Sequence, residues 1–307
     1  MLLFEYPHTT TTVLSFFLLV LSVPFYILFL ITLIRFRKKR PFNCSFYRLV
    51  FNLGIVDMLT IIINYWLIRL PRWGLWPAQI LCTHPQGVLA RASAVLPPFL
   101  GQVQYHCVFA IAYNRFTSLS QPIRYKQMWA GKLSLKVNAA TWTMAVLIFV
   151  PMCFLPIDTL PCDSNSLVAV SALRERKQEE AFFMFGAILN GLMINVSVAL
   201  MYTYSFLKVR HHHNSVAPAR ASVEEIAVRN RREIKYAING FVIFVVMFIY
   251  GLFIGVEATS EVHGALKCSQ VWYIASDIVC GMNPYLLLAS SKKCRKHCWA
   301  TLTCKNG

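Results

Sequence analysis

The chain has 307 residues, of which 57% are apolar and 14% charged, and its mean hydropathy is +0.52. A soluble globular domain is excluded, because a compact fold of this length could not remove so much apolar surface from water. The net charge of +17 does not indicate nucleic-acid binding, which needs a continuous basic face with stacking aromatic residues, whereas these charges fall in four short segments.

Seven apolar stretches follow one another along the chain, and each approaches the length of about 20 residues that crosses a bilayer as a helix. We predict transmembrane helices at residues 13–34, 46–67, 87–113, 135–155, 181–207, 234–256 and 271–288, followed by a short basic tail at 289–307. The expected fold is one all-α membrane domain, a seven-transmembrane helix bundle. We expect the first stretch to be retained, because no basic residue precedes it and a basic cluster follows it, unlike in a signal peptide.

The basic residues orient this bundle. Twenty-three of the 30 lysines and arginines lie on one side of the predicted bundle. They fall in the C-terminal tail and in or near the segments that follow the first, third and fifth helices. Cytoplasmic loops retain Lys and Arg during membrane insertion. The N-terminus is therefore expected outside and the C-terminus in the cytoplasm. The outer segments are short, and the one at residues 156–180 is the most acidic part of the chain.

The third predicted helix carries the most polar residues. Arg91 and Arg115 bracket it, about 36 Å apart at 1.5 Å per residue, with Gln102, Gln104 and His106 between them. A helix facing lipid would not tolerate these side chains, so we expect this helix to be central and buried. For Arg91 the alternatives are snorkelling to lipid headgroups or contact with a ligand, and for His106 the simplest interpretation is a hydrogen-bonded core residue.

Two carboxylates fall within predicted helices, where an ionisable group is costly and normally faces the bundle interior. Asp57 lies near the middle of the second helix. It is either a structural group held by Asn or Ser partners, or a group that senses a cation or a proton. Asp277 lies in the outer half of the seventh helix, where a ligand entering from outside could reach it.

Histidine and cysteine patterns give no metal site and no catalytic site. The eight histidines are scattered over both faces, and His211, His212 and His213 match no metal spacing and are expected in a solvated loop. No cofactor is predicted. The outer cysteines are Cys82, Cys162 and Cys268, so one stays unpaired whichever two pair. Pairing Cys82 with Cys162 would tie the start of the third helix to the second outer loop.

Several motifs resemble those of rhodopsin-like G-protein-coupled receptors. They are Tyr113-Asn114-Arg115-Phe116 with the continuation Gln121-Pro122-Ile123-Arg124-Tyr125, Asp57 in the second helix, and Asn283-Pro284-Tyr285 in the seventh. The amino-acid sequences of these motifs are still more similar to those of nematode serpentine chemoreceptors of the Srg superfamily, with class V (Srv) or class gamma as the nearest families. Asn114 departs from the pattern, because it replaces the acidic neighbour that would pair with Arg115.

This resemblance implies a chemosensory receptor in the plasma membrane of a sensory cell. It would detect an external small molecule and signal to a heterotrimeric G protein. Arg115 would serve coupling, and activation would involve Asp57, Asn283, Pro284 and Tyr285.

A ligand site at the outer ends of the helices would then include Arg91 and Asp277, which we expect to pair in the empty receptor, together with Trp272 and Tyr273. Trp and Tyr also populate interfacial belts, so a belt remains the alternative for the two aromatic residues. Cys294 and Cys298 in the tail are acylation candidates.

Two other functional classes fit the sequence less well. A multi-pass transporter or channel remains the alternative function, although a transporter would show paired repeats with broken helices, and none is visible. A membrane hydrolase would gather His and acidic residues at one membrane face for a metal, so we predict that the protein is not an enzyme.

Overall fold

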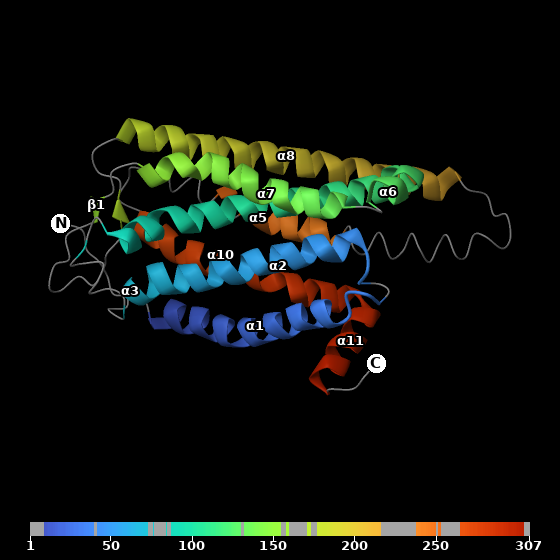
Figure 1. Cartoon of the computed structure of the whole chain (residues 1–307), viewed down its shortest axis with the longest axis horizontal. Helices are drawn as coiled ribbons and strands as arrows, with labels where there is room; N and C mark the ends of the chain where they lie inside the picture. The colour runs from blue at the N-terminus through green and yellow to red at the C-terminus, as the bar shows by residue number, and fades with distance from the viewer. Residues whose placement is uncertain are drawn as a thin grey trace.

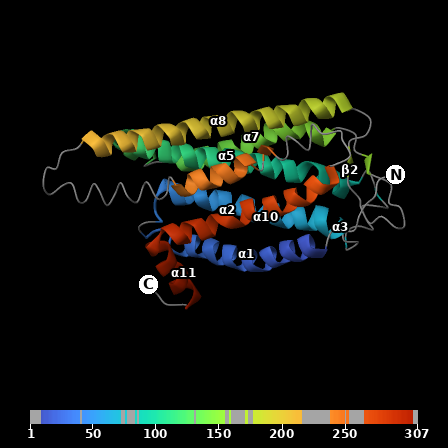
Figure 2. The same ribbon diagram turned by 180° about the vertical axis from the view of Figure 1, so that it is seen from behind.

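The computed structural model describes most of the helical part of the chain. The described residues are 9–39, 42–72, 87–129, 132–154, 177–215, 238–249 and 265–303, with short pieces at 76, 84, 158–159, 171–172 and 251–252. The helices run side by side along the long axis of the molecule, and α11 crosses the bundle at the end where the chain terminates (Figures 1 and 2). The fold is therefore an all-α bundle, as the sequence predicts.

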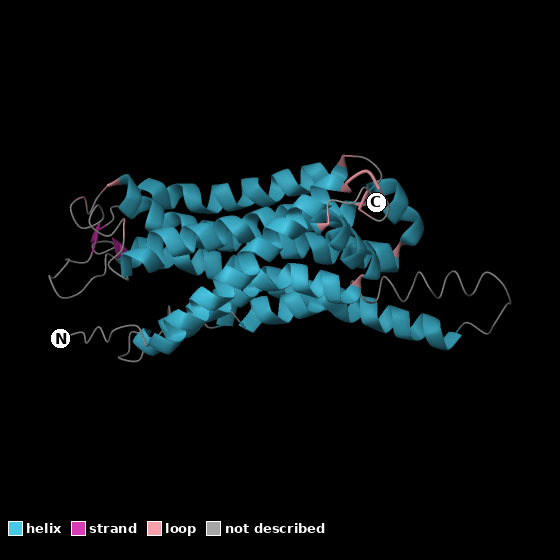
Figure 3. Cartoon of the chain, turned by 90° about the horizontal axis from the view of Figure 1, so that it is seen from below, coloured by secondary structure: helices cyan, strands magenta, loops and turns pink. Residues whose placement is uncertain are grey.

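The elements follow in chain order. They are α1 (Thr9–Arg35), α2 (Ser45–Asn64), the π-helix η1 (Tyr65–Arg69), α3 (Leu70–Arg72), α5 (Val88–Ser120), α6 (Pro122–Trp129), α7 (Leu133–Phe149), the 3-10 helix η2 (Val150–Phe154), α8 (Lys177–Ser215), a helix over Ile238–Ile249, α10 (Ala265–Ser290) and α11 (Lys292–Leu302). Asp158–Thr159 (β1) pairs antiparallel with Ser171–Ala172 (β2), and Figure 3 shows this pair at one end of the bundle.

Helix α5 is the centre of the bundle, as its polar sequence predicts. It packs against α2, α7 and α8, while α1 packs against α2, α10 and α11. Gln102 and Gln104 are buried in α5 beside Val103, so its polar side chains face other helices and not lipid. The α5 interface is thus where side chains from several helices can meet.

The outer surface of α1 is apolar. Val13, Phe16, Phe17 and Val20 are among its exposed side chains, each more than half exposed. Apolar surface of this extent suits a helix facing lipid. Among the described residues, Val13–Arg35 and Ser45–Arg69 are both long and apolar enough to cross a bilayer, and Leu133–Phe149, Ile238–Ile249 and Ile274–Ser290 are shorter apolar helices.

Helices α1, α5, α8 and α10 are longer than their predicted spans, and α5 and α8 extend furthest at their C-terminal ends. Helix α5 continues to Ser120, past the predicted end at residue 113, and α8 continues to Ser215, past residue 207. His211, His212 and His213 are therefore helical, and the expectation of a loop there is wrong. The extension reflects the absence of Gly and Pro between 192 and 215, since no residue there breaks a helix. The start of the sixth predicted helix, residues 234–237, lies outside the described residues.

Close packing between α8 and the helix over 238–249 depends on Gly240. The hydroxyl of Tyr202 occupies the place where a side chain at position 240 would begin. Tyr202 is 1% exposed, and its hydroxyl has no hydrogen-bond partner among the described residues. The phenol is therefore buried against Gly240, and a side chain at position 240 would have to displace it.

We predict that Gly240→Ala destabilises the bundle by about 1–3 kcal/mol, because the added methyl group overlaps the buried phenol. Gly101→Ala is the matched control, since nothing lies within 4 Å of the methyl group that it would add. Thermal unfolding of the purified variants measures both. Adding Tyr202→Phe to Gly240→Ala should restore part of the loss, and equal stability of the two alanine variants would contradict this packing.

Candidate functional site

Asp57 receives hydrogen bonds from three other helices. The Tyr26 hydroxyl of α1 donates to Oδ2 at 2.5 Å, the Asn283 amide of α10 to Oδ2 at 2.6 Å, and the Gln104 amide of α5 to Oδ1 at 2.7 Å. The carboxyl group is buried, and its residue is 1% exposed. All three donors are neutral, so the carboxylate is satisfied by hydrogen bonds and not by an ion pair. Asp57 thus joins α1, α2, α5 and α10 at one point.

A line of polar side chains leads away from Asp57 along α2 and α10. Asn64 lies two helical turns from Asp57 on the same face of α2, and its amide donates to the Ser276 hydroxyl of α10 at 3.2 Å. On α10 the spacing of Ser276, Cys280 and Asn283 keeps all three on one face. The Cys280 sulfur accepts from Gln104 at 3.2 Å. The two helices therefore meet through polar contacts over several turns.

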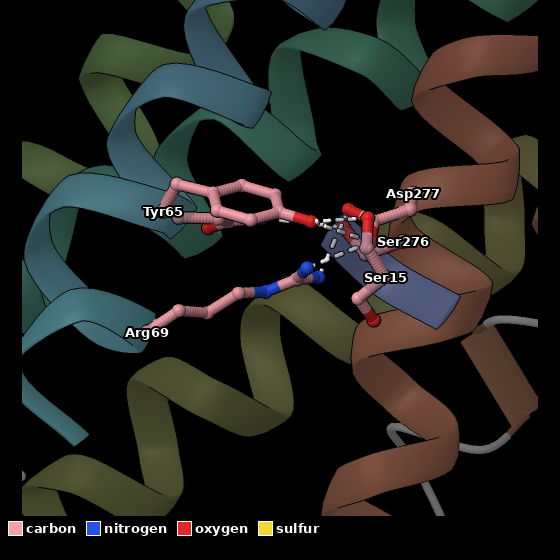
Figure 4. Close-up of polar contacts among 6 residues, drawn as sticks. Ser15, Tyr65, Arg69, Ser276 and Asp277 are labelled. Atoms are coloured by element: carbon pink, nitrogen blue, oxygen red, sulfur yellow. Dashed lines mark hydrogen bonds and ion pairs between the residues drawn. The ribbon is translucent and has the colours of Figure 1, made fainter. Parts of the chain in front are cut away.

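This line ends at a buried ion pair. Arg69 of η1 binds Asp277 of α10 with both prongs of its guanidinium group, Nη1 to Oδ2 at 2.7 Å and Nη2 to Oδ1 at 2.9 Å. The two side chains are 3% and 9% exposed. The Tyr65 hydroxyl contacts both Asp277 Oδ2 at 3.2 Å and the Ser15 carbonyl at 2.9 Å. Figure 4 shows these side chains converging between α1, η1 and α10. We call this side of the bundle the Arg69 end.

The predicted pairing of Arg91 with Asp277 is wrong. Arg91 Nη1 donates to the Cys153 carbonyl at 2.6 Å, and the residue is exposed. Asp277 already has Arg69, which lies beyond the predicted end of the second helix at residue 67. The helix continues through η1 to Arg69 instead of ending at residue 67, and this continuation carries the guanidinium group to α10.

Several predicted residues of this end cannot be compared. The side chains of Trp272 and Tyr273, and the residues Cys82 and Cys162, lie outside the described part of the chain. Nearby, the rings of Trp66 and Trp76 lie 5.6 Å apart.

Arg115 lies at the opposite end of α5, and we call this side the Arg115 end. It is 3% exposed, and its guanidinium carbon lies 3.7 Å from the centre of the Phe46 ring of α2. At this distance a cation is attracted by the face of an aromatic ring. Arg115 is therefore a buried cation stacked on an aromatic face. The adjacent residue, Asn114, carries no charge and cannot form an ion pair with it.

Asn114 takes part in a neutral contact instead of an ion pair. Its amide donates to the Ser45 hydroxyl at 2.9 Å, and Ser45 shares a 3.0 Å hydrogen bond with the Tyr125 hydroxyl. Trp129 of α6 also donates to Thr117 at 3.1 Å. Together these contacts tie the short helix α6 to both α2 and α5.

The Asn283-Pro284-Tyr285 motif faces two ways. Asn283 donates to Asp57 inside the bundle, whereas Tyr285 is 41% exposed and its ring stacks on Phe25 of α1 with centroids 4.6 Å apart. Pro284 lies within α10, where it removes one backbone donor. The motif therefore connects α10 to Asp57 and to α1.

The two cysteines of α11 are buried. Cys294 is 0% exposed and Cys298 is 6% exposed, and α11 packs against α1, where Thr32 donates to Thr301 at 3.1 Å. A hydrogen bond from Cys294 lowers the pKa of Cys298 to about 7. An acyltransferase could reach neither thiol in this packing, so the burial argues against the predicted acylation.

Other polar residues are structural. His106 Nδ1 lies 2.8 Å from the Gln102 carbonyl, a bond within its own helix. Among the described residues no group of three or more His, Cys, Asp or Glu side chains could hold a metal ion.

Arg69, Tyr26 and Ser45 are the contact residues that sequence reasoning missed. A signal for Arg69 existed, because an intramembrane carboxylate such as Asp277 needs a partner, and Tyr65 precedes Arg69 by one helical turn. No comparable signal marks Tyr26 or Ser45, since a Ser hydroxyl can bond to its own helix and a Tyr ring also occurs in an apolar stretch as a packing residue.

Known proteins are similar to this chain over nearly its whole length. The family model described as the serpentine type 7TM GPCR chemoreceptor Srv matches residues 15–304. The chain is also similar to Serpentine receptor class V-1 of Caenorhabditis elegans, with 25% identity over 275 residues, which covers 89% of this chain and 84% of that relative.

We predict that Asp277→Ala lowers stability by about 3–5 kcal/mol, because it leaves the Arg69 guanidinium buried without its counter-ion. Replacing both residues, as Arg69→Met with Asp277→Leu, should recover most of this loss. Arg91→Gln is the control and should change stability little, since that side chain is exposed. Thermal unfolding of the four purified proteins measures the pattern, and a double variant no more stable than Asp277→Ala would refute the ion pair.

Proposed function

Since the chain belongs to the Srv family of serpentine seven-transmembrane chemoreceptors, we propose that it detects an external small molecule and signals to a heterotrimeric G protein. The family is membrane-embedded and is a class of receptors, not of enzymes. The ligand would bind at the Arg69 end, and the G protein at the Arg115 end. The plasma membrane of a sensory cell is the proposed location.

The observation that carries this proposal is the line of polar contacts from the Arg69 end to Asp57 in the middle of the bundle. Asp277 and Asn283 lie on one helix, and Asn283 donates to Asp57 of α2. Asp57 also accepts hydrogen bonds from Tyr26 of α1 and Gln104 of α5. A ligand that binds better to one packing of these helices than to another shifts the equilibrium by that difference in affinity. A movement of α10 at the Arg69 end would therefore change the hydrogen bonds at Asp57.

The ligand-binding residues proposed are Asp277, Arg91, Trp272 and Tyr273. Asp277 has the strongest support, because it is a charged group inside the bundle at the end predicted to face outside. Arg91 would contribute from the rim, where its exposed side chain lies beside Cys153. A coupling role for Arg115 is supported by its position. It lies near the opposite end of α5 from Arg91, far from the proposed ligand site.

Disulfide formation between Cys82 and Cys162 is part of the same proposal. It would fix the outer loop over the start of α5, and the oxidising exterior would permit it.

The proposed orientation rests on the positions of the basic residues and has a direct test. A peptide tag fused before Met1 should be reached by antibody in intact cells, whereas a tag after Gly307 should need permeabilised cells. The reverse labelling would overturn the orientation, and with it a ligand site at the Arg69 end.

Coupling through Arg115 predicts a separation of function. Arg115→Ala should abolish the cellular response to an agonist, read as calcium or cAMP, while surface expression stays near normal. Ligand affinity should change little, because the residue lies about 36 Å from the outer end of its helix. Phe116→Ala is a neighbouring control outside the Phe46 stack. Normal signalling by Arg115→Ala would exclude the coupling role.

A further inference from the structure

The Arg69 guanidinium occupies a cation-binding site built by other residues. Asp277 supplies a carboxylate to it, and Tyr65 supplies an aromatic face at 4.1 Å from the guanidinium carbon (Figure 4). We propose that this site recognises an organic cation, an alkylammonium or alkylguanidinium group, and that Arg69 is a tethered cation that such a ligand displaces. The inference rests on the proposed receptor function and names the ligand class.

Asp277 keeps other partners when Arg69 is absent. The Tyr65 hydroxyl lies 3.2 Å from Oδ2, and Ser15 also hydrogen-bonds to the carboxylate. These donors come from α1 and η1, so they hold the carboxylate in place from two sides. An incoming cation would therefore meet an anion that is already oriented, which reduces the free-energy cost of binding.

The Tyr65 ring suits the same ligand. Its face attracts any ammonium or guanidinium group within about 6 Å of the ring centre, and desolvation strengthens this attraction. Tyr65 is itself buried, with 7% of its surface exposed. A carboxylate and an aromatic face on one buried site together favour a cation over a neutral or anionic group.

Arg69 is placed so that it can leave. It is the last residue of the π-helix η1, and the short α3 that follows ends at Arg72, close to the end of the described helix. Turns of π-helix are rare and concentrate at functional sites. Tightening of this turn to an α-helix would rotate Arg69 about the helix axis and away from α10. Its long side chain could then carry the charge out of the bundle.

The charge of the outer segments favours a cation as well. In the proposed orientation, the outer segments at residues 1–12, 68–86, 156–180 and 257–270 carry eight of the 13 acidic residues but only six of the 30 basic ones. A negative entrance raises the local concentration of cations. An anionic ligand, in contrast, would have to enter beside Asp277 and bind Arg69, which is 3% exposed. The anionic ligand and the Asp277 carboxylate would then repel each other in the same site.

Chemical complementation tests the site directly. Arg69→Ala removes the tethered cation and leaves a space that ethylguanidinium can fill. We expect thermal unfolding of the purified, full-length Arg69→Ala receptor to begin several degrees below that of the unchanged protein. Millimolar ethylguanidinium should restore at least half of that loss, whereas neutral ethylurea and anionic propionate should restore none. The unchanged receptor should need a roughly tenfold higher concentration, because its own Arg69 competes for the site.

The double variant Arg69→Ala with Asp277→Asn is the matched control, and it should not respond to ethylguanidinium. If Arg69→Ala does not fold well enough to purify, its surface expression is measured in cells grown with each compound, and only ethylguanidinium should raise it. Stabilisation by propionate, an equal effect of ethylurea, or no response in either measurement would overturn the inference. These measurements involve no G protein, so their failure would leave the coupling of Arg115 untouched.

Discussion

The bundle depends on how the Asp57 carboxylate is satisfied in an environment that contains few charges. A buried carboxylate without partners would cost several kcal/mol. Here Tyr26, Gln104 and Asn283 each donate to it from a different helix, so no one of these helices can move without loosening a charge-assisted hydrogen bond. Apolar packing against lipid-facing neighbours has no preferred direction, whereas these donors fix the relative register of α1, α5 and α10 against α2.

The same reasoning explains why polar residues gather on single faces of α2 and α10. Asn64 and Ser276 meet two helical turns from Asp57, and Arg69 and Asp277 meet beyond them. Each pair satisfies groups that would otherwise be exposed to hydrocarbon. The interface of α2 with α10 is therefore polar from the Arg69 end to the middle of the bundle, and a shift of α10 must exchange hydrogen bonds instead of only sliding apolar surfaces. Such an interface favours discrete arrangements over continuous deformation.

The sequence predicts the all-α fold and the central position of α5, because the length of apolar stretches and the clustering of polar residues are local properties. It does not predict partners. Asp277 could be identified as a charge in need of a counter-ion, yet the choice between Arg91 and Arg69 depended on whether the second helix ended at residue 67 or continued as a π-helix. Tyr26 and Ser45 could not be found, since their roles come from contacts with residues 31 and 80 positions away in the chain.

The two ends of the bundle differ in the kind of interaction that holds them. Around Asn114 the bonds to Ser45 and on to Tyr125 are neutral, and each such bond contributes only about 0.5–1.5 kcal/mol, because water replaces it when it opens. At the Arg69 end the opening of the ion pair leaves two buried charges, so it is unfavourable unless another charge takes the place of one of them. Opening of the ion pair therefore costs more than opening of the neutral bonds around Asn114, and it takes place where a ligand would bind. For a receptor of this family, such an asymmetry would make the ligand, and not the partner inside the cell, the component that decides the state.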